Sequence, residues 1–362
     1  MRSRDKHKVD PTLAIVFLLL GLGVTRVATA QAGPQYAVVD LGALTHKSIT
    51  FARGLNLSGR VAGRTGDSSG SDTRALLWTA EGVEVLGALT GGDYSAAFGV
   101  NDVGEAVGTS NTATSVRAFV WKRDGGMQDL GTLPGDVGSE AFAINNAGEA
   151  VGTSSGPHGI HAVVWRSDRR IRDLGTLPGG RYSKAAALNE SGLVVGTSGS
   201  AAGERAFLWT SNGGMQNLGT LPGHTSSEAV AVSNDGEVVG YSSGRGGTRA
   251  FRWTRGGGMK DLGTLPGDDW SRALGINNKG QVVGTSTSSA GTRAFLWTSA
   301  GGMQDLNHLI PASFMKLSEA FAINDRGQIV VLSGGGEHSL TPGGDDHEQE
   351  HFYRVLLLTP SS

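Results

Sequence analysis

Tryptophan recurs along this chain at a nearly fixed interval. Six of the seven tryptophans lie 43 or 44 residues apart: Trp78, Trp121, Trp165, Trp209, Trp253 and Trp297. Two further markers keep this register. One is the leucine of an Asp-Leu-Gly element: Leu41, Leu86, Leu130, Leu174, Leu218, Leu262 and Leu306. The other is the first residue of an Asn-x-x-Gly turn: Asn56, Asn101, Asn145, Asn189, Asn277 and Asn324, with Ser233 in the equivalent place once. A period of about 40–45 residues is typical of a four-stranded propeller blade.

Each repeat reads as four strands, and the third repeat serves as the example. Residues 139–144 form a first strand, and 145–148 form a turn in which Asn bonds its own backbone and Gly supplies a positive φ. Second, third and fourth strands follow at 149–154, 161–165 and 171–175. Small residues dominate the first strands, as expected where strands crowd around a propeller axis.

The phase of the repeat predicts how the array closes. The repeats cover about 36–359, and they begin at residue 36 with a fourth strand that no unit precedes. The last unit, which carries a loop insertion at 333–350, ends on a third strand. We therefore predict an all-β fold, a seven-bladed β-propeller of four-stranded blades, closed when the N-terminal strand completes the last blade. Closure removes the bare sheet edge of an open β-solenoid, which is the main alternative.

The N-terminus predicts export. A basic segment precedes an apolar run at 13–24, and Ala28-Thr-Ala30 fits a cleavage site. This pattern indicates a signal peptide at 1–30 and one propeller domain at 31–362, either secreted or periplasmic in a bacterium. An uncleaved anchor is the alternative. With no Cys, the chain has no disulfide and relies on packing.

Charge and hydropathy narrow the partners. The formal net charge is −2 and becomes more negative without residues 1–30, which argues against nucleic acid and anionic membranes. No later segment has the roughly 20 apolar residues of a membrane span. We expect a monomer with a carbohydrate or protein ligand, and the sequence does not name that ligand.

The repeat resembles a known family. Arg205-Ala-Phe-Leu-Trp-Thr, Gly-Gly-Met-x-Asp-Leu-Gly-Thr-Leu-Pro-Gly and Ile-Asn-x-x-Gly-x-Val-Val-Gly are similar to the HAF-repeat family of bacterial extracellular proteins. The chain departs from the His-Ala-Phe tripeptide of that name, since only His161-Ala-Val carries the His. The resemblance implies export and a repeat fold, with no catalytic residues and no defined substrate.

Repeated residues are poor candidates for a site. The recurrent Asp of Asp-Leu-Gly and the Arg that opens each third strand favour a structural pairing. Function is expected where the units differ, on the face that carries the longer connections. Tyr94, Tyr182 and Trp270 precede the first strands of alternate units there and are our ligand-binding candidates, by stacking on sugar rings or an apolar ligand. The simpler interpretation is that each ring packs over a neighbouring loop.

Two motifs suggest catalysis, but their context argues against it. His347-Glu348-Gln-Glu-His351 matches the zinc motif H-E-x-x-H, yet it lies in the Gly-rich insertion without helical periodicity or a third ligand. His338, His347 and His351 are weak metal candidates. Gly152-Thr-Ser-Ser-Gly156 and Gly240-Tyr-Ser-Ser-Gly244 match G-x-S-x-G but end strands of a repeat. Glu140, Glu228 and Glu319 lie at strand starts, which disfavours a pair of opposed glycosidase carboxylates at the axis.

The sequence therefore predicts a binding or scaffolding module that is not an enzyme and needs no cofactor or metal. A zinc-dependent hydrolase using His347, Glu348 and His351 is one alternative. A purely structural envelope protein is the other.

Overall fold

The structure is a computed structural model that describes residues 35–42, 49–66, 73–79, 81–312, 315–334 and 354–361. These residues all belong to the compact unit Gly33–Ser362. The predicted signal peptide and most of the predicted insertion lie outside the described residues. No helix in the described part of the chain is long and apolar enough to cross a membrane.

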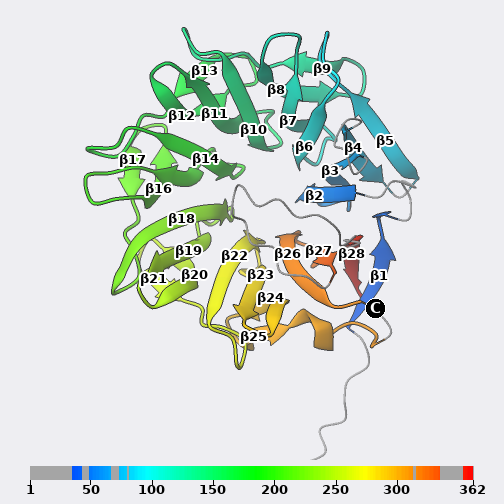
Figure 1. The fold of residues 1–362 in the computed structure, drawn as a ribbon, viewed down its shortest axis with the longest axis vertical. Helices are drawn as coiled ribbons and strands as arrows, with labels where there is room; N and C mark the ends of the chain where they lie inside the picture. Colours follow the sequence, from blue (N-terminus) through cyan, green and yellow to red (C-terminus); the bar gives the residue numbers. More distant parts are fainter. Residues whose placement is uncertain are drawn as a thin grey trace, which may run out of the picture. The chain divides into compact units, whose positions relative to one another are not determined.

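The described residues form seven four-stranded antiparallel sheets arranged as blades around a common centre (Figure 1). Blade 1 contains β2 (Ile49–Leu55), β3 (Val61–Gly66), β4 (Arg74–Thr79) and β5 (Gly82–Gly87). Blade 2 contains β6 (Ser95–Val100), β7 (Ala106–Asn111), β8 (Val116–Lys122) and β9 (Gly126–Asp129). Blade 3 contains β10 (Gly138–Ile144), β11 (Ala150–Gly156), β12 (Gly159–Trp165) and β13 (Ile171–Asp173). Blade 4 contains β14 (Ser183–Leu188), β15 (Val194–Ser198), β16 (Arg205–Thr210) and β17 (Gly214–Asn217).

Blade 5 contains β18 (His224–Val232), β19 (Val238–Gly244), β20 (Gly247–Thr254) and β21 (Gly258–Asp261). Blade 6 contains β22 (Trp270–Ile276), β23 (Val282–Ser288), β24 (Gly291–Thr298) and β25 (Gly302–Asp305), followed by the short 3-10 helix η2 (Leu306–His308). Blade 7 contains β26 (Leu317–Ile323), β27 (Ile329–Ser333), β28 (Arg354–Pro360) and β1 (Tyr36–Asp40). The predicted seven-bladed propeller is thus confirmed.

Strand β1 closes the ring in the way that the phase of the repeat predicts. It pairs with β28 antiparallel, from Tyr36 opposite Pro360 to Asp40 opposite Leu356. Beyond the strand, the indole nitrogen of Trp78 in blade 1 donates to the carbonyl of Leu41 at 3.0 Å. The N-terminal strand therefore completes blade 7 and also contacts blade 1.

The core is divided among the interfaces between blades. In the described part of the chain, one cluster of buried apolar side chains fills each of the seven interfaces. Between blades 3 and 4, for example, Val151 and Ala162 pack with Phe207 and Trp209. Trp165 is fully buried in the preceding interface. The periodic Trp and Phe therefore fill the gap between neighbouring sheets, as the repeat predicts.

A bulge recurs in every first strand, and in six blades it lies opposite the glycine of the Val-Val-Gly motif, which Val331 replaces in blade 7. In blade 3 the register between β10 and β11 shifts between Ala141 and Ala143. The bulge brings the backbone of β10 so close that a Cβ on Gly152 would lie 1.9 Å from the Glu140 carbonyl oxygen. Only glycine fits there, while the buried Ala141 packs toward the neighbouring blade.

The strands define two ends of the central channel, which we name by their connections. The seven first strands, β2, β6, β10, β14, β18, β22 and β26, lie innermost (Figure 1). Each begins at the loop end, where the connections between blades and between second and third strands lie. Each finishes at the Asn end, at the Asn-x-x-Gly turn.

Candidate functional site

In four blades the repeated Asp pairs with the Arg or His that opens the third strand. Arg293 Nη1 lies 3.1 Å from Asp305 Oδ2, and the His161 ring lies 3.0 Å from the Asp173 carboxylate. At the closure, Arg354 Nη1 lies 2.8 Å from Asp40 Oδ2. His161 thus takes the structural place of Arg in its repeat, so these residues belong to the scaffold.

The two G-x-S-x-G motifs also belong to the scaffold. Ser154 and Ser242 are fully buried in second strands. The Ser154 hydroxyl accepts from the backbone N–H of Leu133 at 2.9 Å and donates to Asp136 at 2.6 Å. Ser242 accepts from the N–H of Leu221 at 3.2 Å. Both hydroxyls bind the connection between consecutive blades, and among the described residues neither hydrogen-bonds to a histidine.

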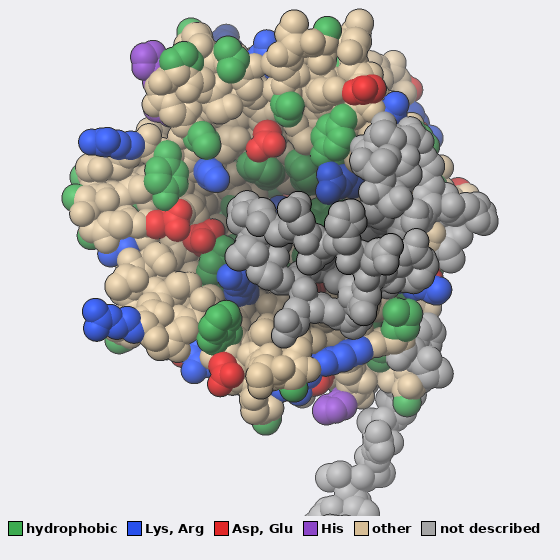
Figure 2. Space-filling model, in the orientation of Figure 1, with side chains coloured by type: hydrophobic (Ala, Val, Ile, Leu, Met, Phe, Trp, Pro, Cys, Tyr) green, Lys and Arg blue, Asp and Glu red, His purple; other side chains and the backbone are tan. Residues whose placement is uncertain are grey.

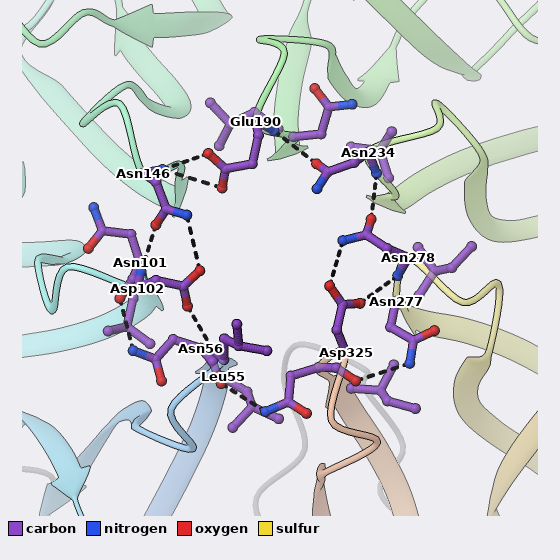
Figure 3. Close-up of a pocket in the computed structure, with 18 of the residues that line it drawn as sticks. Leu55, Asn56, Asn101, Asp102, Asn146, Glu190, Asn234, Asn277, Asn278 and Asp325 are labelled. Carbon is purple, nitrogen blue, oxygen red and sulfur yellow. Dashed lines mark hydrogen bonds between the residues drawn. The ribbon is translucent and has the colours of Figure 1, made fainter.

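A ladder of buried Asn side chains joins the blades at the Asn end (Figure 3). The Asn101 amide nitrogen donates to the carbonyl of Asn145 in the next blade at 3.0 Å. The ladder crosses the closure, because Asn324 donates to the carbonyl of Asn56 at 2.9 Å. Each Asn side-chain oxygen also accepts a backbone N–H within its own turn, as Asn101 does from Glu105 at 2.8 Å. The motif therefore fixes the turn and the neighbouring blade together.

A second, outer ladder follows at the residue after each of these positions. The N–H of Asp102 donates to Asn146 Oδ1 at 2.7 Å, and the N–H of Asn278 donates to Asp325 Oδ1 at 2.8 Å. These side chains, with Glu190 and Asn234, surround a hollow of about 300 Å³ (Figure 3). Their oxygens are already bound to backbone N–H groups. Among the described residues, no three His, Cys, Asp or Glu side chains are grouped to hold a metal ion.

The loop end is built from the same strands but carries different side chains in each blade. We call the first residue of each Asn-x-x-Gly turn, which is Ser233 in blade 5, the ladder residue. The residues five positions before it are Phe51, Ala96, Glu140, Lys184, Glu228, Arg272 and Glu319. Acidic and basic side chains are interspersed around the centre of the face shown in Figure 2. The charge at this position therefore varies from blade to blade. The next residue in each first strand, which is buried, is Ala in every blade.

One cluster at the loop end joins blades 5 and 6. Tyr241 stands where most second strands carry Thr, and its hydroxyl hydrogen-bonds to Glu228. The Arg272 guanidinium lies 4.8 Å from the centre of the Tyr241 ring. Burial raises the pKa of the Glu228 carboxyl above its usual range, against the opposing effect of the Tyr241 hydrogen bond. Burial and then the Glu228 charge raise the pKa of Tyr241. Titratable groups with such shifts are typical of functional sites.

The structure separates the three aromatic residues that the sequence groups together. The Tyr94 hydroxyl accepts a hydrogen bond from Arg64 Nη1 at 2.7 Å. The Tyr182 hydroxyl donates to Glu204 at 2.6 Å, and burial and this carboxylate raise the pKa of Tyr182 to about 12. Both rings are half-buried, whereas Trp270 is 53% exposed. Their role in binding stays a prediction, with Trp270 the most accessible of the three.

Trp270 lies in a cleft between blades 5 and 6. The cleft has a volume of about 600 Å³ and is lined by the turn 244–247, by Asp269 and Trp270, and by 287–289. A Cβ on Gly247 would lie 2.8 Å from the Trp270 indole, so the ring packs edge-on against this turn. Hydroxyls of Thr287, Ser288 and Ser289 and the charged side chains of Arg245 and Asp269 complete the lining. No sequence motif marks this cleft or the Glu228 cluster. Both lie at positions where one repeat carries a different type of residue from the equivalent position in the other repeats.

The proposed zinc residues His347, Glu348 and His351, with His338, lie outside the described residues. Two of the acids at the starts of first strands interact with basic side chains of neighbouring blades. Glu319 interacts electrostatically with Arg53 of blade 1, and Glu228 with Lys184 and Arg272.

No family model and no curated protein matches the chain. Solved structures do match its fold. Virginiamycin B lyase from Staphylococcus aureus, in a catalytically inactive form with quinupristin, is 13% identical with a TM-score of 0.53, over 90% of this chain and 98% of that chain. Puromycin hydrolase is 14% identical with a TM-score of 0.52, over 82% of this chain and 52% of that chain. This chain therefore spans about half the length of puromycin hydrolase.

These neighbours correct one prediction. The sequence predicts that the protein is not an enzyme, and that exclusion is wrong because enzymes share this propeller fold. The prediction relied on the unsuitable context of the H-E-x-x-H and G-x-S-x-G motifs, which does not exclude a site assembled from residues of several blades. At these identities the likeness establishes the fold alone, so the comparisons identify the chain as a β-propeller and assign it no activity.

Proposed function

We propose that this protein is an exported β-propeller of the HAF-repeat type that binds carbohydrate at the loop end through the cleft around Trp270. The observation that carries the proposal is a tryptophan with 53% of its surface exposed inside a cleft that also holds hydroxyl and charged side chains. The periodic Trp78, Trp165 and Trp209 are buried in contrast. Exposing so large an apolar ring has a cost that a ligand offsets.

The lining of the cleft supports a sugar in particular. An indole ring stacks on the apolar C–H face of a pyranose, and hydroxyl, carboxylate and guanidinium groups hydrogen-bond to its hydroxyls. Trp270 supplies the ring, while Asp269, Arg245 and Ser288 supply polar groups. The volume of about 600 Å³ is within the range of ligand pockets. Export is supported by the predicted signal peptide and places the protein where envelope polysaccharides are available.

A glycan array of cell-envelope and extracellular polysaccharides tests this function. We expect selective binding by the parent protein and a loss of at least about ten-fold in affinity for Trp270→Ala, which corresponds to about 1.4 kcal/mol. Trp270→Tyr keeps an aromatic ring and should retain part of the affinity.

Val137→Ala is the matched control, because Val137 is 64% exposed in the equivalent connection of blade 3. It should bind as the parent does. If Trp270→Ala binds every hit as tightly as the parent, the cleft is not the binding site.

A further inference from the structure

Blade 1 carries two arginines at strand positions where the other blades carry none. Three positions before the ladder residue, Arg53 replaces an apolar residue, which elsewhere is Phe98, Phe142, Ala186, Val230, Leu274 or Phe321. In the second strand, Arg64 stands where the other blades have Thr109, Thr153, Thr197, Tyr241, Thr285 or Leu332. The repeat needs neither arginine, since six blades fold without them.

The two arginines converge on one aromatic ring. Phe51 is opposite Arg64 in the pairing of β2 with β3, and Arg53 follows two residues later in β2. Arg53 is the unpaired residue of the bulge between Ala52 and Gly54, so the bulge rather than regular alternation sets the direction of its side chain. The guanidinium carbons of Arg53 and Arg64 each lie 5.6 Å from the centre of the Phe51 ring. The ring also contacts Phe321 of blade 7, with centroids 5.8 Å apart.

The surroundings leave this pair with excess positive charge. Arg64 is half-buried and donates to the neutral Tyr94 hydroxyl, and it makes no ion pair with any described carboxylate. The Arg53 side chain is exposed, desolvation by its neighbours lowers its pKa, and Glu319 is the carboxylate that acts on it. Among the described residues, Glu319 is thus the one carboxylate that acts on Arg53, and none pairs with Arg64.

We propose that Arg53 and Arg64 form a binding site for the carboxylate group of a small ligand at the loop end of the channel. The planar guanidinium fork matches the two oxygens of a carboxylate, and both guanidinium groups lie against the Phe51 ring. Counting the described residues alone, Glu319 offsets one of the two guanidinium charges and one positive charge remains. A monoanionic carboxylate balances it, whereas a phosphate dianion leaves an excess of negative charge in a partly desolvated site.

This site is separate from the cleft of the proposed function. It belongs to blade 1 and its junctions with blades 7 and 2, whereas Trp270 and its cleft belong to blades 5 and 6. The two proposals therefore stand or fall independently.

Titration calorimetry with the full chain tests the site. The probes are acetate, phenylacetate and D-glucuronate, each paired with its uncharged counterpart acetamide, phenylacetamide or D-glucose, and inorganic phosphate. We expect saturable binding of at least one carboxylate and none of its neutral counterpart. Affinity should fall at least ten-fold in Arg53→Leu and in Arg64→Thr, while Arg64→Lys should retain part of it.

Arg53→Leu and Arg64→Thr should both fold, because each introduces a residue that another blade already has at the equivalent position. Thermal unfolding should confirm that they melt like the parent, and Trp270→Ala should bind the carboxylate unchanged. The proposal is overturned if no carboxylate binds, if neutral counterparts bind equally, if phosphate binds in their place, or if Arg53→Leu and Arg64→Thr retain the parent affinity.

Discussion

The two ends of the channel are made from the same seven strands, yet they use sequence in opposite ways. At the Asn end nearly every blade places the same side chain in the same hydrogen bond, as Asn101 and Asn324 illustrate. At the loop end the equivalent positions hold Phe51, Lys184 or Glu228. Repetition thus marks the end that holds the ring together, and variation marks the end available for ligands.

Even the regular end has interruptions. Ser233 replaces Asn in blade 5, and its short side chain accepts a hydrogen bond from the N–H of Glu237 at 3.2 Å. Among the described residues, it makes no hydrogen bond to Asn277 of the next blade. In the outer ladder Leu57 has no side-chain oxygen, so it supplies no acceptor for the N–H of Asp325. These interruptions make the contribution of each rung measurable.

The largest expected effect is the loss of a rung. Asn101→Ala removes the donor to Asn145 and the acceptor for Glu105, and both groups lie in a buried site. We expect the free energy of unfolding to fall by about 1–3 kcal/mol, because buried partners are left unsatisfied. Urea unfolding at neutral pH measures it. Asn146→Ala, in the exposed outer ladder, is the control and should cost less; equal costs would mean that burial of the ladder is unimportant.

A smaller effect of opposite sign is expected from adding a rung. Ser233→Asn introduces the amide that six other blades carry and should donate to the carbonyl of Asn277. We expect the free energy of unfolding to rise by about 0.5–1.5 kcal/mol, the net value of one hydrogen bond. Ser233→Ala, which removes the acceptor for Glu237, should be less stable than the parent. If Ser233→Asn is no more stable than the parent in urea, the ladder is not a general stabilising device.

The smallest effect belongs to the loop end and depends on pH. The raised pKa of Glu228 means that the folded state holds this proton more tightly than the unfolded state. Stability is therefore lost as pH rises from the unfolded pKa, about 4.3, through the folded value. We expect Glu228→Gln to gain about 1–3 °C in Tm relative to the parent between pH 4 and pH 7.5.

Scanning calorimetry at both pH values measures this difference. Tyr241→Phe keeps the titrating carboxyl and should still lose stability relative to Glu228→Gln over the same pH range. An offset between Glu228→Gln and the parent that is the same at both pH values would contradict a raised pKa.

Much of the scaffold was predictable because equivalent positions of the repeats have the same structural environment, and the sequence shows each of them several times. The buried Trp78 and Trp165, the pairing of Arg293 with Asp305 and the pairing of β1 with β28 all follow from the register of the repeat. The candidate sites were less predictable. Arg53 and Arg64 are eleven residues apart and form no motif, and only the pairing of β2 with β3 brings both to Phe51. Aligning the repeats marks them as exceptions without showing that they meet.

The sequence by itself determined the number of blades, the position of the closing strand and the identity of the buried aromatic residues, because these depend on period and phase. The tertiary structure alone decided which exceptional residues become neighbours. Tyr94 bonds Arg64 of the preceding blade, Tyr182 bonds Glu204 within its own blade, and Trp270 remains exposed. Local sequence sets the end of the channel at which each aromatic side chain lies. The closure of the propeller and the loop conformations set its hydrogen-bond partner. The period of the repeat places these segments side by side but does not specify which of their side chains meet.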